Sequence, residues 1–243
     1  MIEETTPLLK RIDAMPAIPW NDFREATRIT RDLLAELAND KNSLRILTDR
    51  IASSPELLAQ CECHELLERL DLYDGRDRNF QIRFNFTTPN HSVRPHDHRY
   101  SFSTFILRGK YKHIWFDPGQ AIYDNEADEQ ALNHLDKNHP DSETGVVTTR
   151  MTPLFVTTES VGAQYTIHHS TVHATITTPE SLSIIIKGPG EKSRSLIADR
   201  ESGKIWWRFG RQMENLDRVN SKKMSFEYYQ QLRSKLSEWG ITQ

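Results

Sequence analysis

The feature that most constrains the fold is a series of short segments rich in β-branched and aromatic residues, closely spaced along the middle of the chain. They span residues 80–86, 101–107, 111–116, 146–150, 154–158, 164–169, 171–177 and 182–187. Turn-like sequences such as Arg108-Gly109 separate several of them, and two further runs flank residues 201–203 and predict a hairpin. Many short strands without regular intervening helices favour an antiparallel sandwich or barrel.

Both ends of the chain show helical spacing instead. Asn21 or Asp22 can cap a first helix, whose apolar residues are Phe23, Ala26, Ile29, Leu33, Leu34 and Leu37. A second short helix is predicted over 43–51, and a third begins at Ser54-Pro55 and runs through Leu70. With a last helix over 224–239, we expect a helical segment at 1–75, a β-barrel at 76–210 and a helical tail at 211–243.

Composition argues against several classes of partner. The 243 residues can bury a sizeable core, and 31 basic against 34 acidic residues leave a formal net charge of -3. No concentrated basic face suggests a nucleic acid, and no window approaches the roughly 18 apolar residues of a membrane span. The first twenty residues do not resemble a signal peptide, and Cys61 and Cys63 are too close in sequence to join distant parts of the fold. We therefore expect a cytoplasmic protein with no nucleic-acid or membrane partner.

A possible metal site begins at His96 and His98. Residues two apart on a strand point to the same face, so the two imidazoles can reach one ion such as Fe, Zn or Ni. An H-x-H pair is a weak signal by itself, and two polar residues near the solvent end of a strand are the other interpretation. A third histidine, His173, lies far along the chain in another predicted strand.

These separated pieces resemble the cupin superfamily, small β-barrels with a metal in the mouth, and most specifically its cysteine dioxygenase-like (thiol dioxygenase) branch. The matching residues are His96-Asp97-His98, Ser101, Leu107-x-Gly109, Tyr165 eight residues before His173, and Ser183 followed by Pro189. The similarity covers about residues 80 to 209. It implies a mainly β, cupin-type antiparallel β-barrel (jelly roll) with an N-terminal helical segment and a C-terminal helix, and it makes His96, His98 and His173 the metal ligands.

In most cupins a glutamate five residues after the second histidine is a fourth ligand, and here Ser103 stands at that position. The resemblance then implies a three-histidine Fe(II) site whose open positions take O2 and a chelating substrate, with Zn or Ni as less favoured metals. The residues that serve thiol oxidation in that branch are replaced by Lys187, Ile185 and Thr177, so free cysteine is not the expected substrate.

Two cations in the predicted strands are candidates for substrate binding. A cation that faces a barrel interior is costly unless it is paired, and an anionic substrate is one possible partner for Arg83 and Lys187. The alternatives are that each lies at the rim or pairs with an internal acid. We expect Arg83 and Lys187 to hold a carboxylate or phosphate, and Lys187, Tyr165 and Ser103 to contribute catalytic contacts.

Several other polar residues need an interpretation. His168 or His169 could replace His173 as a ligand or lie behind the ligands. His113 could also face the barrel interior, although a surface position on its strand is the favoured interpretation. The run Cys61-Glu62-Cys63-His64 is interpreted as ordinary helix, on which residues two apart face away from each other. Residues 117–145 are acidic and too long for a hairpin turn, which predicts an excursion from the β core.

The leading hypothesis is a mononuclear non-haem iron oxygenase that acts on a small anionic metabolite, such as an amino acid or a related carboxylate. A redox-neutral isomerase or lyase that uses Zn or Ni is the second hypothesis, and a non-catalytic small-molecule-binding cupin is the third. A homodimer is possible for such a fold.

Overall fold

The computed structural model describes residues 4–64, 67–88, 94–117, 146–147, 151–199, 204–209 and 215–243. Its largest element is a six-stranded antiparallel sheet in the order β1-β2-β3-β10-β4-β8. Its strands are β1 (Glu62–Cys63), β2 (Leu67–Gly75), β3 (Phe80–Thr87), β10 (Leu182–Lys187), β4 (Phe102–Arg108) and β8 (Gln164–Ile167).

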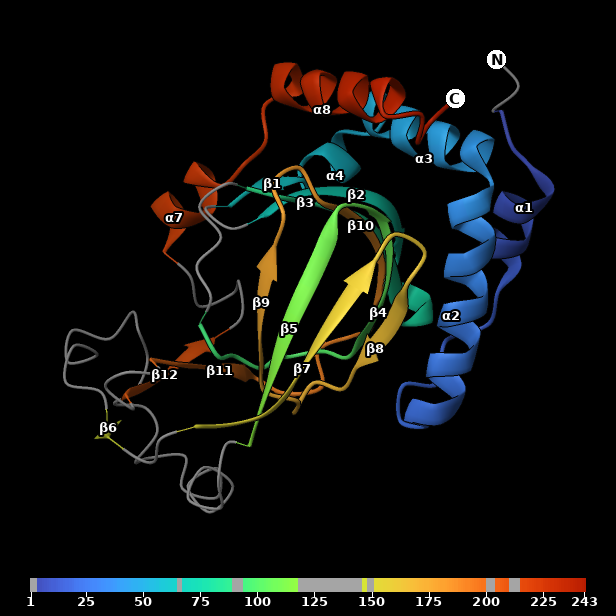
Figure 1. Cartoon of the computed structure of the whole chain (residues 1–243). Coiled ribbons are helices and arrows are strands. Elements are labelled where there is room, and N and C mark those ends of the chain that lie inside the picture. The colour runs from blue at the N-terminus through green and yellow to red at the C-terminus, as the bar shows by residue number, and fades with distance from the viewer. Residues whose placement is uncertain are drawn as a thin grey trace.

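Two three-stranded sheets complete the β structure. One contains β7 (Thr152–Ser160), β5 (Lys110–Asp117) and β9 (His173–Thr177), and the other contains β11 (Arg194–Ala198), β12 (Lys204–Phe209) and β6 (Val146–Val147). Figure 1 shows β9, β5 and β7 facing the curved six-stranded sheet across the middle of the molecule. The mainly antiparallel β fold is confirmed, with one correction: the strand pairs of the described segments form separate sheets and do not close into a barrel.

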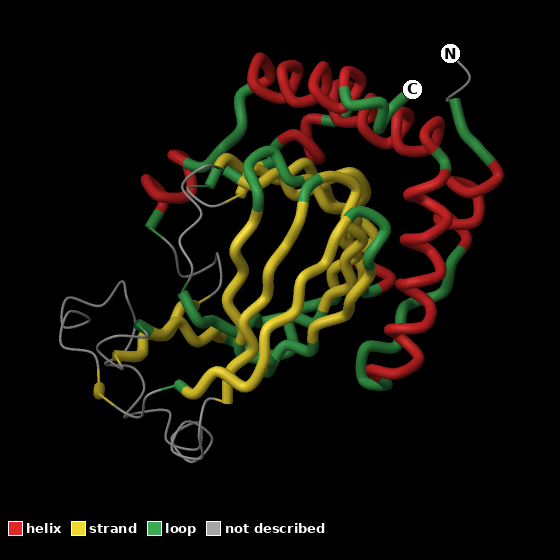
Figure 2. Tube along the Cα trace, in the orientation of Figure 1, coloured by secondary structure: helices red, strands yellow, loops and turns green. Residues whose placement is uncertain are grey.

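Helices pack against the outer side of the six-stranded sheet and along its upper edge (Figure 2). The described helices are α1 (Pro7–Ala14), α2 (Phe23–Asn39), α3 (Lys41–Ser53), α4 (Pro55–Leu58), η1 (Arg76–Arg78), α7 (Leu216–Ser221) and α8 (Phe226–Glu238). Of these, α7 lies apart from the others in Figure 1 and buries no side chain. Asp22 caps α2 by accepting a hydrogen bond from the Glu25 amide, and Ser54 caps α4 with Pro55 at its first position, as the sequence predicts.

The third predicted helix is wrong beyond Leu58. The segment predicted to continue it instead forms β1 and β2, and β2 pairs with β3 within the segment 1–75 that was expected to be helical. The spacing of residues within this segment could not predict a strand, because pairing with the distant strand β3 determines its conformation. In that strand, Leu70 and Leu72 face the helices, while Asp71 lies opposite Arg83. Cys61 is buried, and burial raises the pKa of its thiol to about 12, so the thiol stays protonated. The run Cys61-Glu62-Cys63-His64, interpreted as helix, instead contains β1.

The alternation of β3 and β10 separates an apolar outer face from a polar inner face. The outer face belongs to the main core, in which Ile82, Phe84, Ile184 and Ile186 are buried together with leucines of α2 and α3. The inner face therefore carries the intervening polar positions, and it is the face turned toward β5, β7 and β9.

Two further expectations concern the acidic excursion and the absence of membrane spans. Apart from Asp117, the predicted excursion 117–145 lies outside the described residues. Within the described segments, no helix is long and apolar enough to cross a lipid bilayer.

The turn between β4 and β5 requires a glycine. Gly109 has φ of +79°, and a Cβ there would lie 2.9 Å from the Ser181 Cα and 2.0 Å from its Oγ. We expect Gly109→Ala to lower the free energy of unfolding, measured by urea denaturation, through both backbone strain and overpacking. Gly162→Ala is the matched control, because Gly162 has φ of +87° but a Cβ added there would have no atom within 4 Å. Gly109→Ala should cost about 1–3 kcal/mol more than the control, and equal losses would contradict the packing argument.

Candidate metal centre

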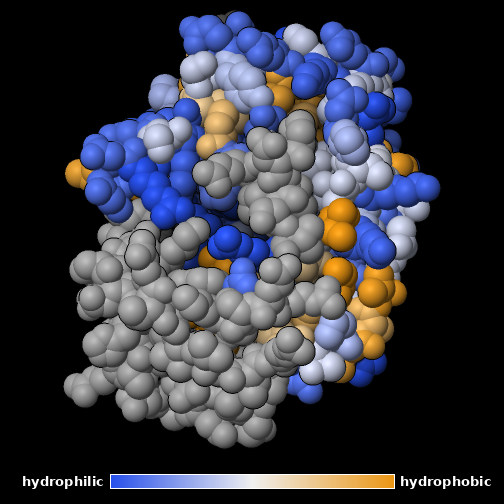
Figure 3. Space-filling view, turned by 60° about the vertical axis from the view of Figure 1, so that its left-hand side comes forward, coloured by the Kyte–Doolittle hydropathy of each residue, from blue (hydrophilic) through white to orange (hydrophobic). Residues whose placement is uncertain are grey.

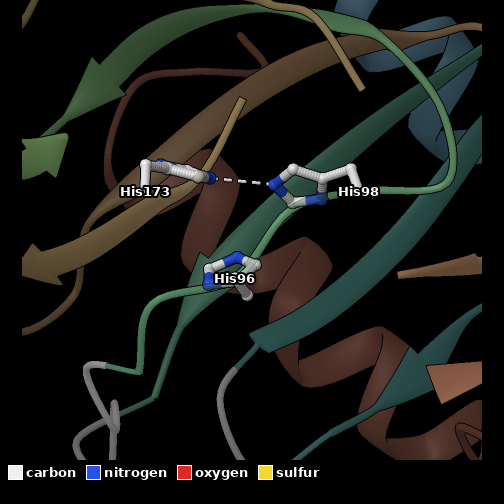
Figure 4. A group of neighbouring side chains, drawn as sticks. All are labelled: His96, His98 and His173. Atoms are coloured by element: carbon white, nitrogen blue, oxygen red, sulfur yellow. Dashed lines mark hydrogen bonds between the residues drawn. The ribbon is translucent and has the colours of Figure 1, made fainter. Parts of the chain in front are cut away.

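His96, His98 and His173 converge in the structure (Figure 4). Their candidate ligand atoms all lie within 4.8 Å of one another, and the Nε2 atoms of His98 and His173 are 2.8 Å apart. The backbone brings the segments together, because His96 and His173 exchange amide-to-carbonyl hydrogen bonds of 2.8 and 2.9 Å. Asp97 points the opposite way and accepts a hydrogen bond from the Leu196 amide at 2.6 Å, so the side chains alternate as the H-x-H spacing predicts.

The electrostatics of the cluster suit metal binding. Burial lowers the pKa of His98 and of His173 well below the ordinary value, and neighbouring histidines lower each further. Both imidazoles are therefore neutral, which is the state that binds a metal. His96 Nδ1 lies 2.9 Å from the Arg94 carbonyl oxygen, which can only accept, so this nitrogen carries the proton and Nε2 keeps its lone pair. The three residues thus fit a transition-metal ion.

Aromatic rings surround the cluster. The Phe102 ring lies 4.8 Å from the His98 ring, and Trp115 stacks on His173 at 5.7 Å. Phe155 stacks on the outer side of Trp115 at 5.9 Å and is 55% exposed, so the aromatic stack extends from the histidines to the surface. On the face that Figure 3 turns forward, the surface has a recess with hydrophilic side chains within it.

The structure corrects the expected role of Ser103. Its hydroxyl lies 2.6 Å from the Thr30 hydroxyl of α2 and 2.8 Å from the Thr166 hydroxyl, on the helix-facing side of the sheet. Because adjacent strand residues face opposite sides, Phe102 rather than Ser103 points toward His98. Ser103 therefore does not shape the surroundings of the histidines, and an apolar ring stands beside the cluster on this strand.

Lys187 and Arg83 lie on the inner face, as predicted, but with different partners. Arg83 Nε donates to Asp71 Oδ1 at 2.7 Å, which is the internal ion pair that the sequence left open as an alternative. Lys187 makes no ion pair with any described residue; its Nζ donates to the neutral Gln81 side chain at 3.2 Å and lies 4.4 Å from the centre of the Tyr100 ring. Burial, and next the charge of Arg83, lower the pKa of Lys187 to about 8.

Tyr100 is a site residue that the sequence interpretation missed. Its ring lies 5.9 Å from the His98 ring, and the Lys187 Nζ lies 4.4 Å from its centre. Burial opposes ionisation of its phenol, but the positive charges of Arg69, Lys187 and Arg83 outweigh burial and lower its pKa. Its position two residues after His98 was the available signal, because that spacing keeps the same face.

His113 corrects another expectation, since it is fully buried inside rather than at the surface. Its Nδ1 lies 3.1 Å from Glu159 Oε2, and its ring lies 5.3 Å from that of His173. Tyr165 packs edge-on against His113 at 4.7 Å, and burial raises the pKa of its phenol well above the ordinary value. Tyr165 is therefore a neutral inner-face residue beside His113. The pattern Tyr-x-His-x-Trp, with large residues on one face, was the signal for this burial.

Comparison with known proteins gives only distant similarities. No family model and no curated protein matches the chain. Among solved structures, KdgF from Halomonas sp. is 12% identical, with 52% of this chain and 82% of that chain covered and a TM-score of 0.31. An RmlC-like cupin from Shewanella frigidimarina is 11% identical, with coverage of 53% and 81% and a TM-score of 0.32. Fe(II)-HppE with an alternative substrate is 13% identical, with coverage of 52% and 51% and a TM-score of 0.30. These low scores carry no argument about the site, and none of these three proteins is named as a thiol dioxygenase.

Proposed function

We propose that this protein is a mononuclear non-haem iron oxygenase that acts on a small anionic metabolite of the amino acid or carboxylate class. The observation that carries the proposal is the convergence of three imidazoles, with Tyr100 in contact both with His98 and with Lys187, a half-buried lysine that has no ion-pair partner among the described residues. A bound Fe(II) ion would supply O2 activation, and a three-histidine set leaves coordination positions open for O2 and substrate.

The surrounding residues would hold and orient the substrate. Of three cations whose charges act on Tyr100, Arg69 pairs with Glu62 at 3.0 Å and Arg83 with Asp71 at 2.7 Å, whereas Lys187 makes no ion pair with a described residue. Its Nζ lies 4.4 Å from the centre of the Tyr100 ring, and the His98 ring lies 5.9 Å from the same ring, so an anion bound by Lys187 would lie near the ligand cluster. Arg83, which the sequence offered as a second substrate-binding cation, is instead paired with Asp71. Phe102 and Trp115 would exclude water from the histidines.

A redox-neutral isomerase or lyase with Zn or Ni is the second candidate. The His113–Glu159 pair favours it, because a carboxylate beside an imidazole is a frequent arrangement in general acid–base chemistry. The homodimer and the thiol dioxygenase branch remain predictions from the sequence.

Oxygen consumption by the iron-loaded protein, over a panel of amino acids, carboxylates and thiols, separates these functions. We expect iron-dependent oxygen uptake with one anionic class. Turnover at full rate without oxygen would contradict the oxygenase and favour the redox-neutral enzyme. Binding of a panel member without turnover under either condition would favour the non-catalytic alternative.

The charge of Lys187 predicts a pH dependence of substrate binding. Its pKa in the folded protein is about 8, below its ordinary value, so the ammonium is present below this pH and is lost as the pH rises through it. We expect the KM for the anionic substrate to rise about tenfold or more above pH 8. Lys187→Gln should show the high KM at every pH, whereas Lys187→Arg should keep a low KM above pH 8, since its guanidinium stays protonated. A wild-type KM that does not change between pH 7 and 9 would contradict this role.

A further inference from the structure

A second group of metal-binding side chains lies outside the three-histidine cluster. His168 and His169 follow β8, and Glu191 follows β10. The candidate ligand atoms of these three residues all lie within 4.8 Å of one another, and His169 Nδ1 is 3.0 Å from Glu191 Oε2. The proposed function uses none of these side chains.

The backbone around Ser101 fixes two members of this group. The Ser101 amide donates to Glu191 Oε1 at 2.8 Å, and its hydroxyl accepts from the His169 amide at 3.1 Å. The Glu191 amide in turn donates to the Arg99 carbonyl at 2.8 Å. The carboxylate and one imidazole are therefore held together by the polypeptide and not only by their mutual attraction.

His168 completes the group from the outer side. Its ring centre lies 4.0 Å from that of His169, and its edge packs against Phe23 at 5.0 Å. The Ser170 hydroxyl lies 2.7 Å from His168 Nδ1, and the Ser170 amide donates a hydrogen bond to the same nitrogen at 3.4 Å. Binding of an ion at Nε2 therefore requires the ring proton to move to Nδ1, where the hydroxyl can accept a hydrogen bond from it at the loss of the longer amide contact. The ion pair between His169 and Glu191 does not need His168, so it does not explain why a second imidazole lies beside it.

We propose that His168, His169 and Glu191 form a second site for a divalent transition-metal ion, of which Zn²⁺ is the best fit. Two imidazoles and one carboxylate form a ligand set that Zn²⁺ readily accepts, whereas Mg²⁺ and Ca²⁺ favour oxygen ligands. Bonds of about 2.0–2.1 Å in a tetrahedral site place neighbouring ligand atoms about 3.3 Å apart. His169 Nδ1 and Glu191 Oε2 are 3.0 Å apart, and no pair of ligand atoms is more than 4.8 Å apart, so side-chain movement of about 1–2 Å would close the site and leave a fourth position for water.

Calorimetric titration of the metal-free full-length protein with Zn²⁺ tests the second site. The wild-type chain should bind two equivalents, and His168→Phe should bind one, with at least about tenfold weaker residual affinity at the second site. Phenylalanine preserves the contact with Phe23, and His168 makes no hydrogen bond to the segment that carries His98. His98→Ala is the reciprocal control, which should lose the first equivalent and keep the second.

The proposal would be overturned if the wild-type protein bound a single equivalent of Zn²⁺ and His98→Ala bound none. It would also be overturned if His168→Phe still bound two equivalents of Zn²⁺. A measurement on the wild-type protein avoids dependence on variants. In histidine-ring NMR spectra during the same titration, the signals of His168 and His169 should shift with one equivalent, separately from those of His96 and His98. Ring signals of His168 and His169 that do not move with either equivalent would equally overturn the site. Both readouts are independent of oxygenase activity.

Discussion

Replacing His98 with alanine is expected to abolish turnover and to weaken iron binding by at least about 100-fold. His98 Nε2 lies 2.8 Å from His173 Nε2, so its loss leaves two imidazoles to hold the ion. Changes to residues that only support metal ligands already cost about 10–100-fold in affinity, and loss of a ligand should cost more. Iron content by mass spectrometry and oxygen consumption with the substrate found for the wild-type protein measure the two effects.

His64→Ala is the matched control for this experiment. His64 lies beside β1, outside both groups of histidines, and its replacement should leave metal content and turnover near the wild-type values. Iron content and turnover of His98→Ala that equal those of His64→Ala would show that the three-histidine cluster is not the metal centre.

Asp71→Ala is expected to lower the free energy of unfolding by about 3–5 kcal/mol, the largest stability loss that we predict. The Asp71 side chain is 2% exposed and that of Arg83 is 14% exposed, so the substitution leaves a guanidinium charge in the interior. Burial is the largest single influence and opposes that charge, but the charge and hydrogen bond of Asp71, together with Tyr100 and Glu62, outweigh burial and raise the pKa of Arg83. Without Asp71 the charge has no compensating carboxylate at this distance.

The double variant Asp71→Leu with Arg83→Met separates loss of the pair from exposure of one charge. Replacement of a whole buried pair by apolar residues of similar size is often close to neutral, so the double variant should recover most of the stability lost in Asp71→Ala. Urea denaturation measures both. A double variant that is less stable than Asp71→Ala would show that the pair contributes stability beyond mutual neutralisation.

The sequence correctly predicted those features of the fold that depend on interactions between residues close together in the chain. The cap at Asp22, the cap at Ser54 and the shared face of His96 and His98 all follow from interactions within a few residues. The approach of His173 came from a resemblance spread along the chain, and the backbone pairing of His96 with His173 now gives it a physical basis.

The errors arise where a distant partner decides the outcome. The segment of β2 has leucines that suit a helix, and only pairing with β3 makes it a strand. A shift of one residue decides whether Ser103 or Phe102 faces the histidines, and sequence alone does not set that register. Arg83 and Lys187 look alike in sequence, yet Asp71 neutralises one of them and no described carboxylate pairs with the other.

The paired hydrogen bonds between His96 and His173 have a consequence for the cohesion of the molecule. These residues are far apart in sequence, and their backbones are already joined before any ion enters. An ion bound by both residues would cross-link the two ends of the chain segment between them. The entropic cost of this cross-link is small, because the backbone hydrogen bonds already hold those ends together. Metal loading should therefore slow the separation of β9 from the segment preceding β4. Amide hydrogen exchange at His96 and His173 should then become slower in proportion to metal occupancy.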